Sequence, residues 1–372
     1  MKIISIQVNA IHLPFKNPFT IAYETYKVMP SLILKMETDD GLVGYGEAVP
    51  DQHVTGETWE STLSNIKNYL APVVLGENPF NIEKIHDKMN AVLHYAPTAK
   101  AAIDIACYDL MGKVAKQPIF NLLGGAYYQS LSITHVIGMG TNEEMIKEAK
   151  SAIDQGYSEL KIKVGNTPRE DVQLVAEIRK AVGPKIKLRL DANQGWKQTT
   201  TALQALKELE KYYIDWMEQP IIAANRVGLA ELHQRTSIPI MADESIHGAE
   251  QLRELISLNA IDLINIKLMK CGGIYPAQQL VHQAQMAGIS CIIGSMIESS
   301  ISTAAGAHLA LSKKNVVANE LGSPLIFSKD IAPMMYKKNK LFVPQQPGLG
   351  IQVNEELLKR LSIRGEEISS SL

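Results

Sequence analysis

The sequence predicts an α/β fold: a modified (β/α)8 TIM barrel of the (β/α)7β kind, with an α+β capping domain. The first observation is a set of short apolar segments, each ending in a charged residue, with 24 to 28 residues between successive ends. This spacing is about the length of one strand plus one helix, which indicates repeated βα units. The second is that strands and then helices precede this repeat, and the third is a tail that follows it. The five segments end at Lys163, Asp191, Glu218, Asp243 and Lys267.

Residues 1–125 are expected to form the capping domain. Residues 2–14 and 31–48 read as antiparallel strands, and Asp40-Gly41 supplies a tight turn in the second region. Three helical stretches follow, and their placement after the strands favours a separate α+β unit. The loops at residues 15–28 and 50–56 combine aromatic, glycine and polar residues, so they are candidates for a lid. The helices are predicted at residues 57–70, 81–93 and 98–114.

The barrel is expected over residues 126–321, and the tail over residues 322–372 is expected to return to the capping domain. Apolar runs bounded by polar residues mark its strands, with helical stretches between them. The eight strands are predicted at residues 133–137, 159–164, 186–191, 214–218, 238–243, 263–268, 291–296 and 316–320.

Composition narrows the possible functions. The net charge of −2 gives no general attraction to nucleic acid or to an anionic membrane, so a small-molecule partner is expected. No apolar run approaches the length of a membrane span, and the N-terminus lacks the apolar core of a signal peptide. The three cysteines are far apart and form no C-x-x-C pair, which excludes a thiolate zinc site and fits a reducing cytoplasm.

Side-chain alternation along the strands places charged residues inside the barrel. Successive residues of a strand face opposite sides, so Lys161 and Lys163 share one face while Leu160 and Ile162 share the other. The same alternation in the next strand directs Lys187, Arg189, Asp191 and Asn193 toward the axis or its upper rim. Charged groups are rarely buried unless they are paired or bind a ligand. A buried structural salt-bridge network would explain this pattern, but charges at the same end of five strands favour catalysis.

Three carboxylates predict a metal site. Asp191, Glu218 and Asp243 offer only oxygen ligands, which suit Mg²⁺, with Mn²⁺ as a substitute. No His or Cys lies beside them at the strand ends, which argues against zinc. Asn193, Gln219 and Glu244 are candidates for supporting roles.

Lys163 and Lys267 predict proton transfer on both faces of a substrate. Lys161 and a bound cation both disfavour the charged form of Lys163, as a base requires. Lys163 and Lys267 come from distant strands, so they would approach a substrate on the barrel axis from opposite sides. A 1,1-proton transfer needs this arrangement, with the metal holding the substrate carboxylate and stabilising an enolate.

These motifs resemble the enolase superfamily, in particular its muconate-lactonising subgroup, over essentially the whole chain. The resemblance rests on Lys161-Ile162-Lys163, Asp191-Ala192-Asn193-Gln194, Glu218-Gln219-Pro220, Ala242-Asp243-Glu244-Ser245, Asn265-Ile266-Lys267 and Lys270-Cys271-Gly272-Gly273. It implies that Asp191, Glu218 and Asp243 bind Mg²⁺. It further implies that Lys163 and Lys267 are the acid/base pair and that Lys161 helps electrostatically. A Lys base with Mg²⁺ is a known chemistry of this superfamily. Two early loops closing over the substrate and a homo-oligomeric state are also expected.

The subgroup contains several reactions, and this sequence is most similar to racemases of N-succinyl arginine and lysine. Dipeptide epimerases usually carry Asp-x-Asp in the eighth strand, whereas this chain has Glu320-Leu321-Gly322. The leading expectation is a racemase of N-succinylated amino acids with basic side chains, and Asp51 is a candidate for meeting the cationic group. A dipeptide epimerase, a muconate cycloisomerase, an o-succinylbenzoate synthase and a non-catalytic binding barrel are the alternatives. The predicted substrate contacts are Asn193, Tyr26, Asp51, Thr134, Met296, Glu298 and Glu320.

Overall fold

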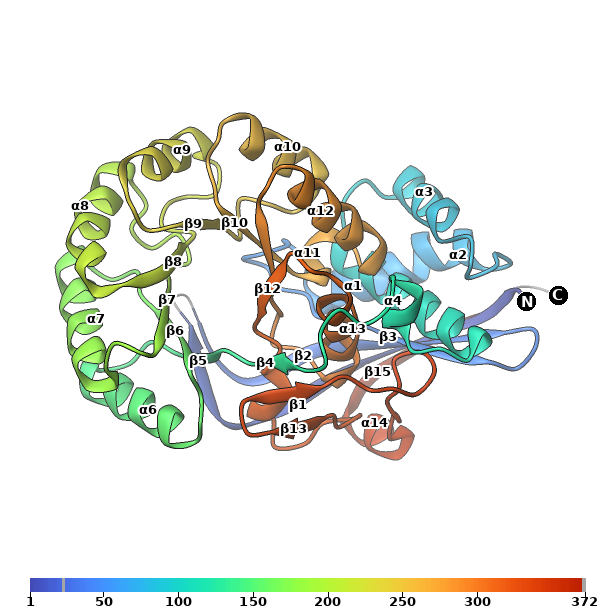
Figure 1. The fold of residues 1–372 in the computed structure, drawn as a ribbon. Coiled ribbons are helices and arrows are strands. Elements are labelled where there is room, and N and C mark those ends of the chain that lie inside the picture. The colour runs from blue at the N-terminus through green and yellow to red at the C-terminus, as the bar shows by residue number, and fades with distance from the viewer. Residues whose placement is uncertain (22–23, 370–372) are drawn as a thin grey trace.

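The computed structural model describes residues 1–21 and 24–369, with the side chains of residues 19–26 outside the described set. It contains an eight-stranded parallel sheet that curls round an axis, with helices outside it and a separate sheet beside it (Figure 1). The predicted fold class is therefore confirmed. No helix within the described residues is long and apolar enough to cross a membrane.

The barrel sheet runs in sequence order from β5 to β12, and every neighbouring pair for which a register is defined is parallel. Its two edges approach each other where the Thr134 amide donates to the Asn319 carbonyl at 3.5 Å. The strands are β5 (His135–Ile137), β6 (Glu159–Lys163), β7 (Lys187–Asp191), β8 (Ile214–Glu218), β9 (Ile240–Ala242), β10 (Leu263–Ile266), β11 (Ser290–Ile293) and β12 (Val316–Asn319).

Seven long helices alternate with these eight strands, as in a (β/α)7β barrel. Two of them, α6 and α7, begin with capping boxes, in which Thr141 and Thr167 exchange hydrogen bonds with Glu144 and Glu170. A single turn, α11 (Leu268–Cys271), is inserted after β10. The helices are α6 (Asn142–Asp154), α7 (Pro168–Val182), α8 (Thr199–Leu209), α9 (Arg226–Arg235), α10 (Ala249–Ser257), α12 (Ile274–Met286) and α13 (Ser300–Ser312).

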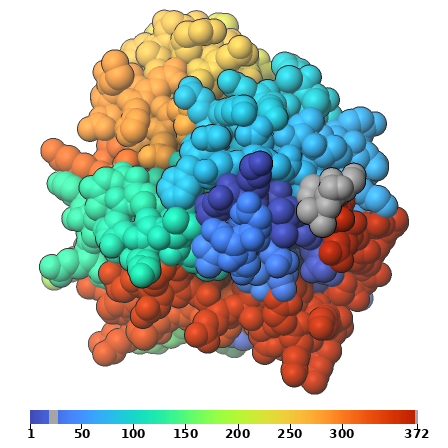
Figure 2. Space-filling view, turned by 90° about the vertical axis from the view of Figure 1, so that its right-hand side faces the viewer, coloured from blue at the N-terminus to red at the C-terminus, as the bar shows by residue number. Residues whose placement is uncertain are grey.

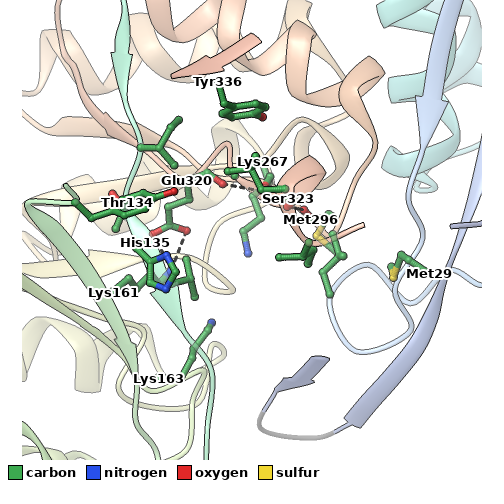
Figure 3. Close-up of a pocket in the computed structure, with 18 of the residues that line it drawn as sticks. Met29, Thr134, His135, Lys161, Lys163, Lys267, Met296, Glu320, Ser323 and Tyr336 are labelled. Carbon is green, nitrogen blue, oxygen red and sulfur yellow. Dashed lines mark hydrogen bonds and ion pairs between the residues drawn. The ribbon is translucent and has the colours of Figure 1, made fainter. Parts of the chain in front are cut away.

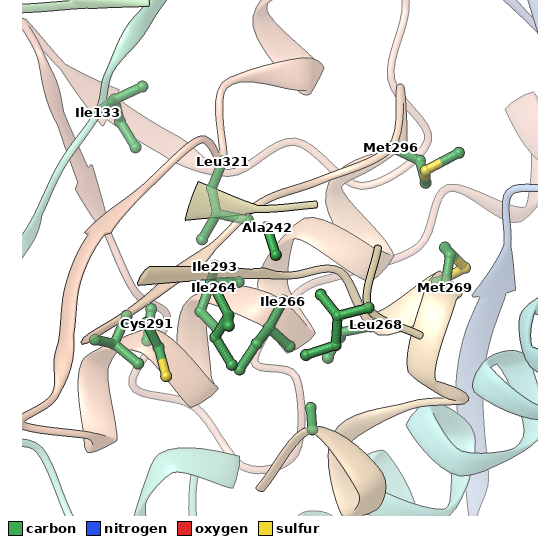
Figure 4. Packing of buried hydrophobic residues seen from close by; sticks show 14 of the residues in the cluster. Ile133, Ala242, Ile264, Ile266, Leu268, Met269, Cys291, Ile293, Met296 and Leu321 are labelled. Atoms are coloured by element: carbon green, nitrogen blue, oxygen red, sulfur yellow. The ribbon is translucent and has the colours of Figure 1, made fainter. Parts of the chain in front are cut away.

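Apolar side chains between the strands and the helices form the main core. Ile264 and Ile266 of β10 pack beside Cys291 and Ile293 of β11 (Figure 4), and all four are buried. The alternate residues of β6 behave in the same way, since Leu160 and Ile162 are fully buried in this core. The outward apolar face thus leaves the inward face of the barrel for charged residues.

Alternation places most of the predicted charged residues correctly, with Lys187 as an exception. Arg189 is 2% exposed inside the barrel, where its guanidinium lies 4.1 Å from the Trp216 ring centroid and 2.7 Å from Glu159. Lys187 was expected to face the axis or the upper rim, but its side chain is 56% exposed and pairs with Glu159. Lys187 starts β7, so it lies at the end of the barrel opposite the strand termini, where water is accessible.

The capping domain contains a sheet in the order β15-β1-β2-β3, covered by helices. β3 packs so closely on α4 (Pro97–Ala115) that a Cβ atom at Gly46 would lie only 1.9 Å from the Ala102 carbonyl oxygen. The other elements are β1 (Ile3–Ile21), β2 (Glu24–Thr38), β3 (Val43–Ala48), α1 (Trp59–Asn65), the π-helical turn Ile66–Leu70, α2 (Ala71–Val74), α3 (Ile82–Val92) and α5 (Ile119–Leu122).

The C-terminal segment contacts both parts of the molecule. The hairpin β13 (Met335–Lys337) and β14 (Lys340–Phe342) pairs with β4 (Leu131–Ser132) at the entry to the barrel. After α14 (Glu355–Leu361), β15 (Ser362–Ser369) pairs antiparallel with β1. Figure 2 shows the resulting proximity of the N-terminal and C-terminal segments.

The loop predicted at residues 15–28 is wrong, because residues 15–21 belong to β1 and residues 24–28 to β2. In the barrel, the strand bounds differ from the predicted ones mainly at the C-terminal ends of the strands. The sixth strand was predicted to run to Leu268, but β10 ends at Ile266 and Lys267 is the extended N-cap of α11. The fifth strand was predicted over residues 238–243 and pairs only over Ile240–Ala242. In both cases the predicted site residue, Asp243 or Lys267, directly follows the strand.

Buried His308 predicts a pH dependence of stability. Its Nδ1 accepts from the Phe120 amide at 3.3 Å and its Nε2 donates to the Leu349 carbonyl at 3.1 Å, which fixes the neutral form. Burial lowers the pKa of His308 from 6.5 to about 4. The unfolded chain binds this proton more readily than the folded protein does. We therefore expect the contribution of His308 to the free energy of unfolding to fall by up to about 3 kcal/mol as the pH falls from 6.5 to 4.

Urea unfolding at several pH values checks this expectation, with His308→Gln as the matched variant. The glutamine amide can accept from Phe120 and donate to Leu349, but it does not titrate. The difference in unfolding free energy between the parent and H308Q should therefore narrow or reverse as the pH falls through this window. A difference that stays constant between pH 7 and pH 4 would contradict the assignment.

Candidate active site

A cavity of about 600 Å³ opens at the C-terminal ends of the barrel strands, next to the capping domain (Figure 3). It is lined by the predicted site residues Lys161, Lys163, Lys267, Asn193 and Glu320. Its walls come from distant segments: Asp51 and Val54 from the second predicted lid loop, Met296 from the loop after β11, and Tyr336 from β13. The cavity therefore lies where the barrel, the cap and the tail meet.

The three predicted metal ligands come from adjacent strands and are fully buried. Asp191 and Glu218 are the last residues of β7 and β8 and are directly paired in register, and Asp243 follows β9. Each of the three is 0% exposed. Because parallel strands end at one level, their carboxylates are brought to the same rim.

Lys161 lies among these carboxylates. Its Nζ is 2.9 Å from Asp191 Oδ2, 2.7 Å from Glu218 Oε2 and 2.9 Å from the Glu320 carboxylate. Burial disfavours its charge, but the three carboxylates outweigh burial and raise its pKa well above the ordinary value. Burial raises the pKa of Asp191, yet Lys161 and Lys163 together hold it at about 2. Lys161 is therefore a fixed cation in this site.

Lys163 and Lys267 reach the cavity from different sides (Figure 3). Lys163 Nζ lies 2.7 Å from Asp191 Oδ2 and 2.6 Å from Asn193 Oδ1, and Lys267 Nζ lies 2.6 Å from Asp243 Oδ2. Burial disfavours the charge of Lys267, but Asp243 outweighs burial and raises its pKa. Both side chains are 13% exposed, unlike Lys161 at 3%, so their amines remain accessible from the cavity.

Two residues without a predicted role hold the carboxylates in place. Lys270 is 2% exposed, contacts Asp243 Oδ1, and donates to the backbone carbonyls of Asp243 and Asn265 at 2.5 and 3.1 Å. Asn265 Nδ2 donates to Glu218 Oε1 at 2.9 Å. The motif after the sixth predicted strand contains Lys270, but no alternation rule applies to the short helix that places it.

The chemistry of the carboxylate cluster fits a hard divalent cation. Glu218 Oε2 is buried and accepts no hydrogen bond of good geometry, although Lys161 Nζ is 2.7 Å away. Burial and neighbouring Asp191 raise the pKa of Glu218 well above its usual range, because the buried cluster disfavours another negative charge unless a further cation is present. As placed here, no three His, Cys, Asp or Glu side chains of the described residues converge on one point. To bind a cation, the three carboxylates would therefore have to turn away from the lysines that they contact here.

The predicted substrate contacts divide into three groups. Asn193, Asp51, Thr134, Met296 and Glu320 line the cavity. The side chain of Tyr26 lies outside the described residues. Glu298 is not among the lining residues: its carboxylate is buried, accepts from Thr303 Oγ1 at 3.3 Å and lies near Glu47.

Glu320 and Asp51 are already engaged by the protein. Both Glu320 oxygens lie 2.9 Å from Lys161 Nζ, so this carboxylate shares the Lys161 ammonium with Asp191 and Glu218 before a substrate arrives. Asp51 is 7% exposed, and its Oδ1 accepts from the amides of His53 and Val54 at 2.8 and 3.1 Å. These two contacts shape the lid turn and leave the other carboxylate oxygen for the cavity side.

Comparison with known proteins identifies the family. The mandelate racemase / muconate lactonizing enzyme N-terminal domain matches residues 3–124, and the enolase C-terminal domain-like family matches residues 144–357. An N-succinyl-L-Arg/Lys racemase from Bacillus cereus is 49% identical over 98% of both chains. Its crystal structure superposes with a TM-score of 0.98, covering 99% of this chain and 100% of that one.

Other relatives catalyse different reactions. A hydrophobic dipeptide epimerase from Enterococcus faecalis is 42% identical over 94% of this chain and 99% of its own. A crystal structure of a dipeptide epimerase from that organism, complexed with Mg and L-Leu-L-Tyr, has a TM-score of 0.91 at 41% identity and covers 95% of this chain and 100% of that one. The resemblance inferred from the sequence motifs is confirmed: this chain belongs to the enolase superfamily, in its mandelate racemase/muconate-lactonizing branch, and its relatives include isomerases of amino acid derivatives.

Proposed function

We propose that this protein is a Mg²⁺-dependent racemase of N-succinylated amino acids with basic side chains. The observation that carries the reaction type is the pair of accessible lysines, Lys163 and Lys267, on different sides of one cavity and beside three buried carboxylates. The substrate class is supported by the 49% identity to the N-succinyl-L-Arg/Lys racemase.

The proposed metal ligands are Asp191, Glu218 and Asp243. Bound there, Mg²⁺ would supply positive charge to the substrate carboxylate and to the negative charge that develops when the α-proton leaves. Lys270 and Asn265 orient two of these carboxylates through the contacts described above. Lys161, held charged between Asp191 and Glu320, adds a fixed positive charge at the same end of the barrel.

The two accessible lysines would exchange roles with the enantiomer. In one direction, neutral Lys163 removes the proton from Cα and the Lys267 ammonium donates a proton to the other face of Cα. For the opposite enantiomer, Lys267 is the base and Lys163 the acid. The contact with Asp243 favours the ammonium form of Lys267, as a proton donor requires, and engagement of Asp243 by a cation would weaken that preference.

Solvent exchange in D₂O tests the proposal. The protein with Mg²⁺ is incubated with N-succinyl-L-arginine, N-succinyl-L-lysine, L-Ala-L-Glu, cis,cis-muconate and the o-succinylbenzoate precursor, and mass and chirality are followed. Deuterium at Cα with formation of the D-isomer, from the succinylated substrates only, is the expected result. Exchange with the dipeptide would instead assign an epimerase, and conversion of muconate or the precursor without racemisation would assign a cycloisomerase or lyase.

Asp51 is expected to contribute to selection of the cationic side chain. We expect Asp51→Asn to raise KM for N-succinyl-L-arginine by about tenfold while changing KM for a neutral N-succinylamino acid much less. The asparagine oxygen can still accept from His53 and Val54, so the lid turn should persist. Steady-state kinetics with both substrates check the expectation, and an equal change for the two would assign Asp51 to the lid turn alone.

A further inference from the structure

The wall of the cavity also contains two lysines, Lys16 and Lys338, that the proton-transfer chemistry does not use. Lys16 comes from β1 in the capping domain, and Lys338 comes from the turn between β13 and β14 in the tail. Leu325 and Ile326, which follow β12, line the same cavity. Segments that are more than 300 residues apart in the sequence thus place two cations at one cavity.

Lys16 is held at this wall by well-defined contacts. Its Nζ donates to the Leu325 carbonyl at 2.8 Å. The adjacent Phe15 stacks on Phe327 with ring centroids 5.2 Å apart, and the Ser328 amide donates to the Pro14 carbonyl at 2.9 Å. One carbonyl satisfies only part of an ammonium with three donors, so Lys16 has hydrogen-bonding capacity left for a ligand.

Lys338 occupies a backbone conformation that disfavours a lysine. Its φ is +55°, in the left-handed region that glycine and asparagine adopt more easily. An asparagine, the residue type at the next position (Asn339), adopts this conformation at a lower energetic cost than a lysine.

Within the part of the chain that the structure describes, no carboxylate compensates the charges of these two lysines. Among the described residues, neither Lys16 nor Lys338 forms an ion pair, whereas Lys161, Lys163 and Lys267 each contact a carboxylate. Glu320, the acidic group of the eighth strand, contacts Lys161. At this wall, Lys16 and Lys338 therefore offer positive charge that no carboxylate of the described chain contacts, which attracts an anion and repels the free ammonium of a dipeptide.

We propose that Lys338 and Lys16 recognise a second carboxylate on the substrate, at the far end of its N-acyl group. This inference rests on the proposed racemase function and extends it by naming the two groups that select a dicarboxylic acyl chain. The ligand class is an N-acylamino acid whose acyl group ends in a carboxylate. An N-acetyl analogue would leave both ammonium groups without a partner in the complex.

Binding and kinetics of the Mg²⁺-loaded protein test this selection separately. Calorimetry compares N-succinylglycine with N-acetylglycine, and kinetics compare N-succinyl-L-arginine with N-acetyl-L-arginine. The parent is expected to bind N-succinylglycine at least about tenfold more tightly, and Lys338→Asn and Lys16→Met are each expected to lose most of that preference. The losses should appear in KM for the succinylated substrate, with kcat nearly unchanged, and Lys16→Arg should restore them in part.

Lys340→Met is the matched control, because Lys340 lies in the same hairpin but outside the cavity. K338N also relieves the strained φ, so its melting temperature should not fall, and lost selectivity cannot then be attributed to unfolding. Equal binding of the two glycine derivatives by the parent, or unchanged selectivity in both variants, would overturn the inference. Selective binding without turnover of any N-acylamino acid would retain the inference and overturn the racemase proposal instead.

Discussion

Replacing either Lys163 or Lys267 by alanine is expected to reduce racemisation by at least about a thousandfold while leaving exchange of one enantiomer. Each variant keeps one base, which can still remove and return a proton on its own face of Cα. It lacks the acid on the other face, so inversion stops. K163A and K267A should therefore exchange the α-proton of opposite enantiomers when each is incubated in D₂O with N-succinyl-L-arginine and N-succinyl-D-arginine.

Lys187→Ala is the matched control, since Lys187 lies on the strand next to Lys163 but at the opposite, exposed end of the barrel. It should retain full racemisation. A variant of Lys163 or Lys267 that still interconverts the enantiomers would refute the two-base mechanism. Elimination or cycloisomerisation that survives in K267A, without proton exchange, would favour the lyase alternative, in which only one lysine acts as a base.

Two simple regularities explain how much of this molecule the sequence predicts. The 24-to-28-residue spacing follows from the length of a βα unit, so it identifies the barrel without any knowledge of packing. Alternation along a strand fixes which face a side chain occupies, and it correctly places Lys161, Arg189 and Asp191 inside the barrel. The strand-end residues that line the cavity were therefore predictable.

The cavity walls follow neither regularity. Lys187 shows the limit of alternation, which gives the face of the sheet but not the height along the barrel axis. Lys270 lies on a one-turn helix, where neither strand nor helix periodicity can be established from four residues. Lys16, Leu325 and Lys338 line one cavity only because the tail packs against the barrel and the cap, and such long-range proximity depends on tertiary structure.

A substitution at Glu218 is expected to separate catalysis from stability. In the cation-free protein, burial and Asp191 raise the pKa of Glu218 well above its usual range. The folded protein thus holds this proton more tightly than the unfolded chain, and ionisation of Glu218 reduces stability as the pH rises toward neutrality. We therefore expect Glu218→Gln, which can still accept from Asn265 but places its amide nitrogen near Lys161, to lose little stability relative to the parent at pH 7 in the presence of EDTA.

The same substitution should abolish the response to Mg²⁺. The parent is expected to gain about 3 kcal/mol of stability at a Mg²⁺ concentration near one hundred times its Kd, and E218Q to gain almost none. Racemisation should fall by more than about a hundredfold. Urea unfolding with EDTA and with Mg²⁺ measures both effects, alongside racemisation rates.

Asp215→Asn provides the comparison on the same strand. Burial also raises the pKa of Asp215, but this residue lies near the other end of β8, 3.8 Å from Arg189 and outside the cavity. D215N should keep the full Mg²⁺ response and the parent's racemisation rate. If E218Q also kept its Mg²⁺ response, Glu218 would not be a metal ligand. If E218Q were strongly destabilised with EDTA, its carboxylate would instead belong to a structural ion-pair network with Lys161, the alternative that the sequence alone left open.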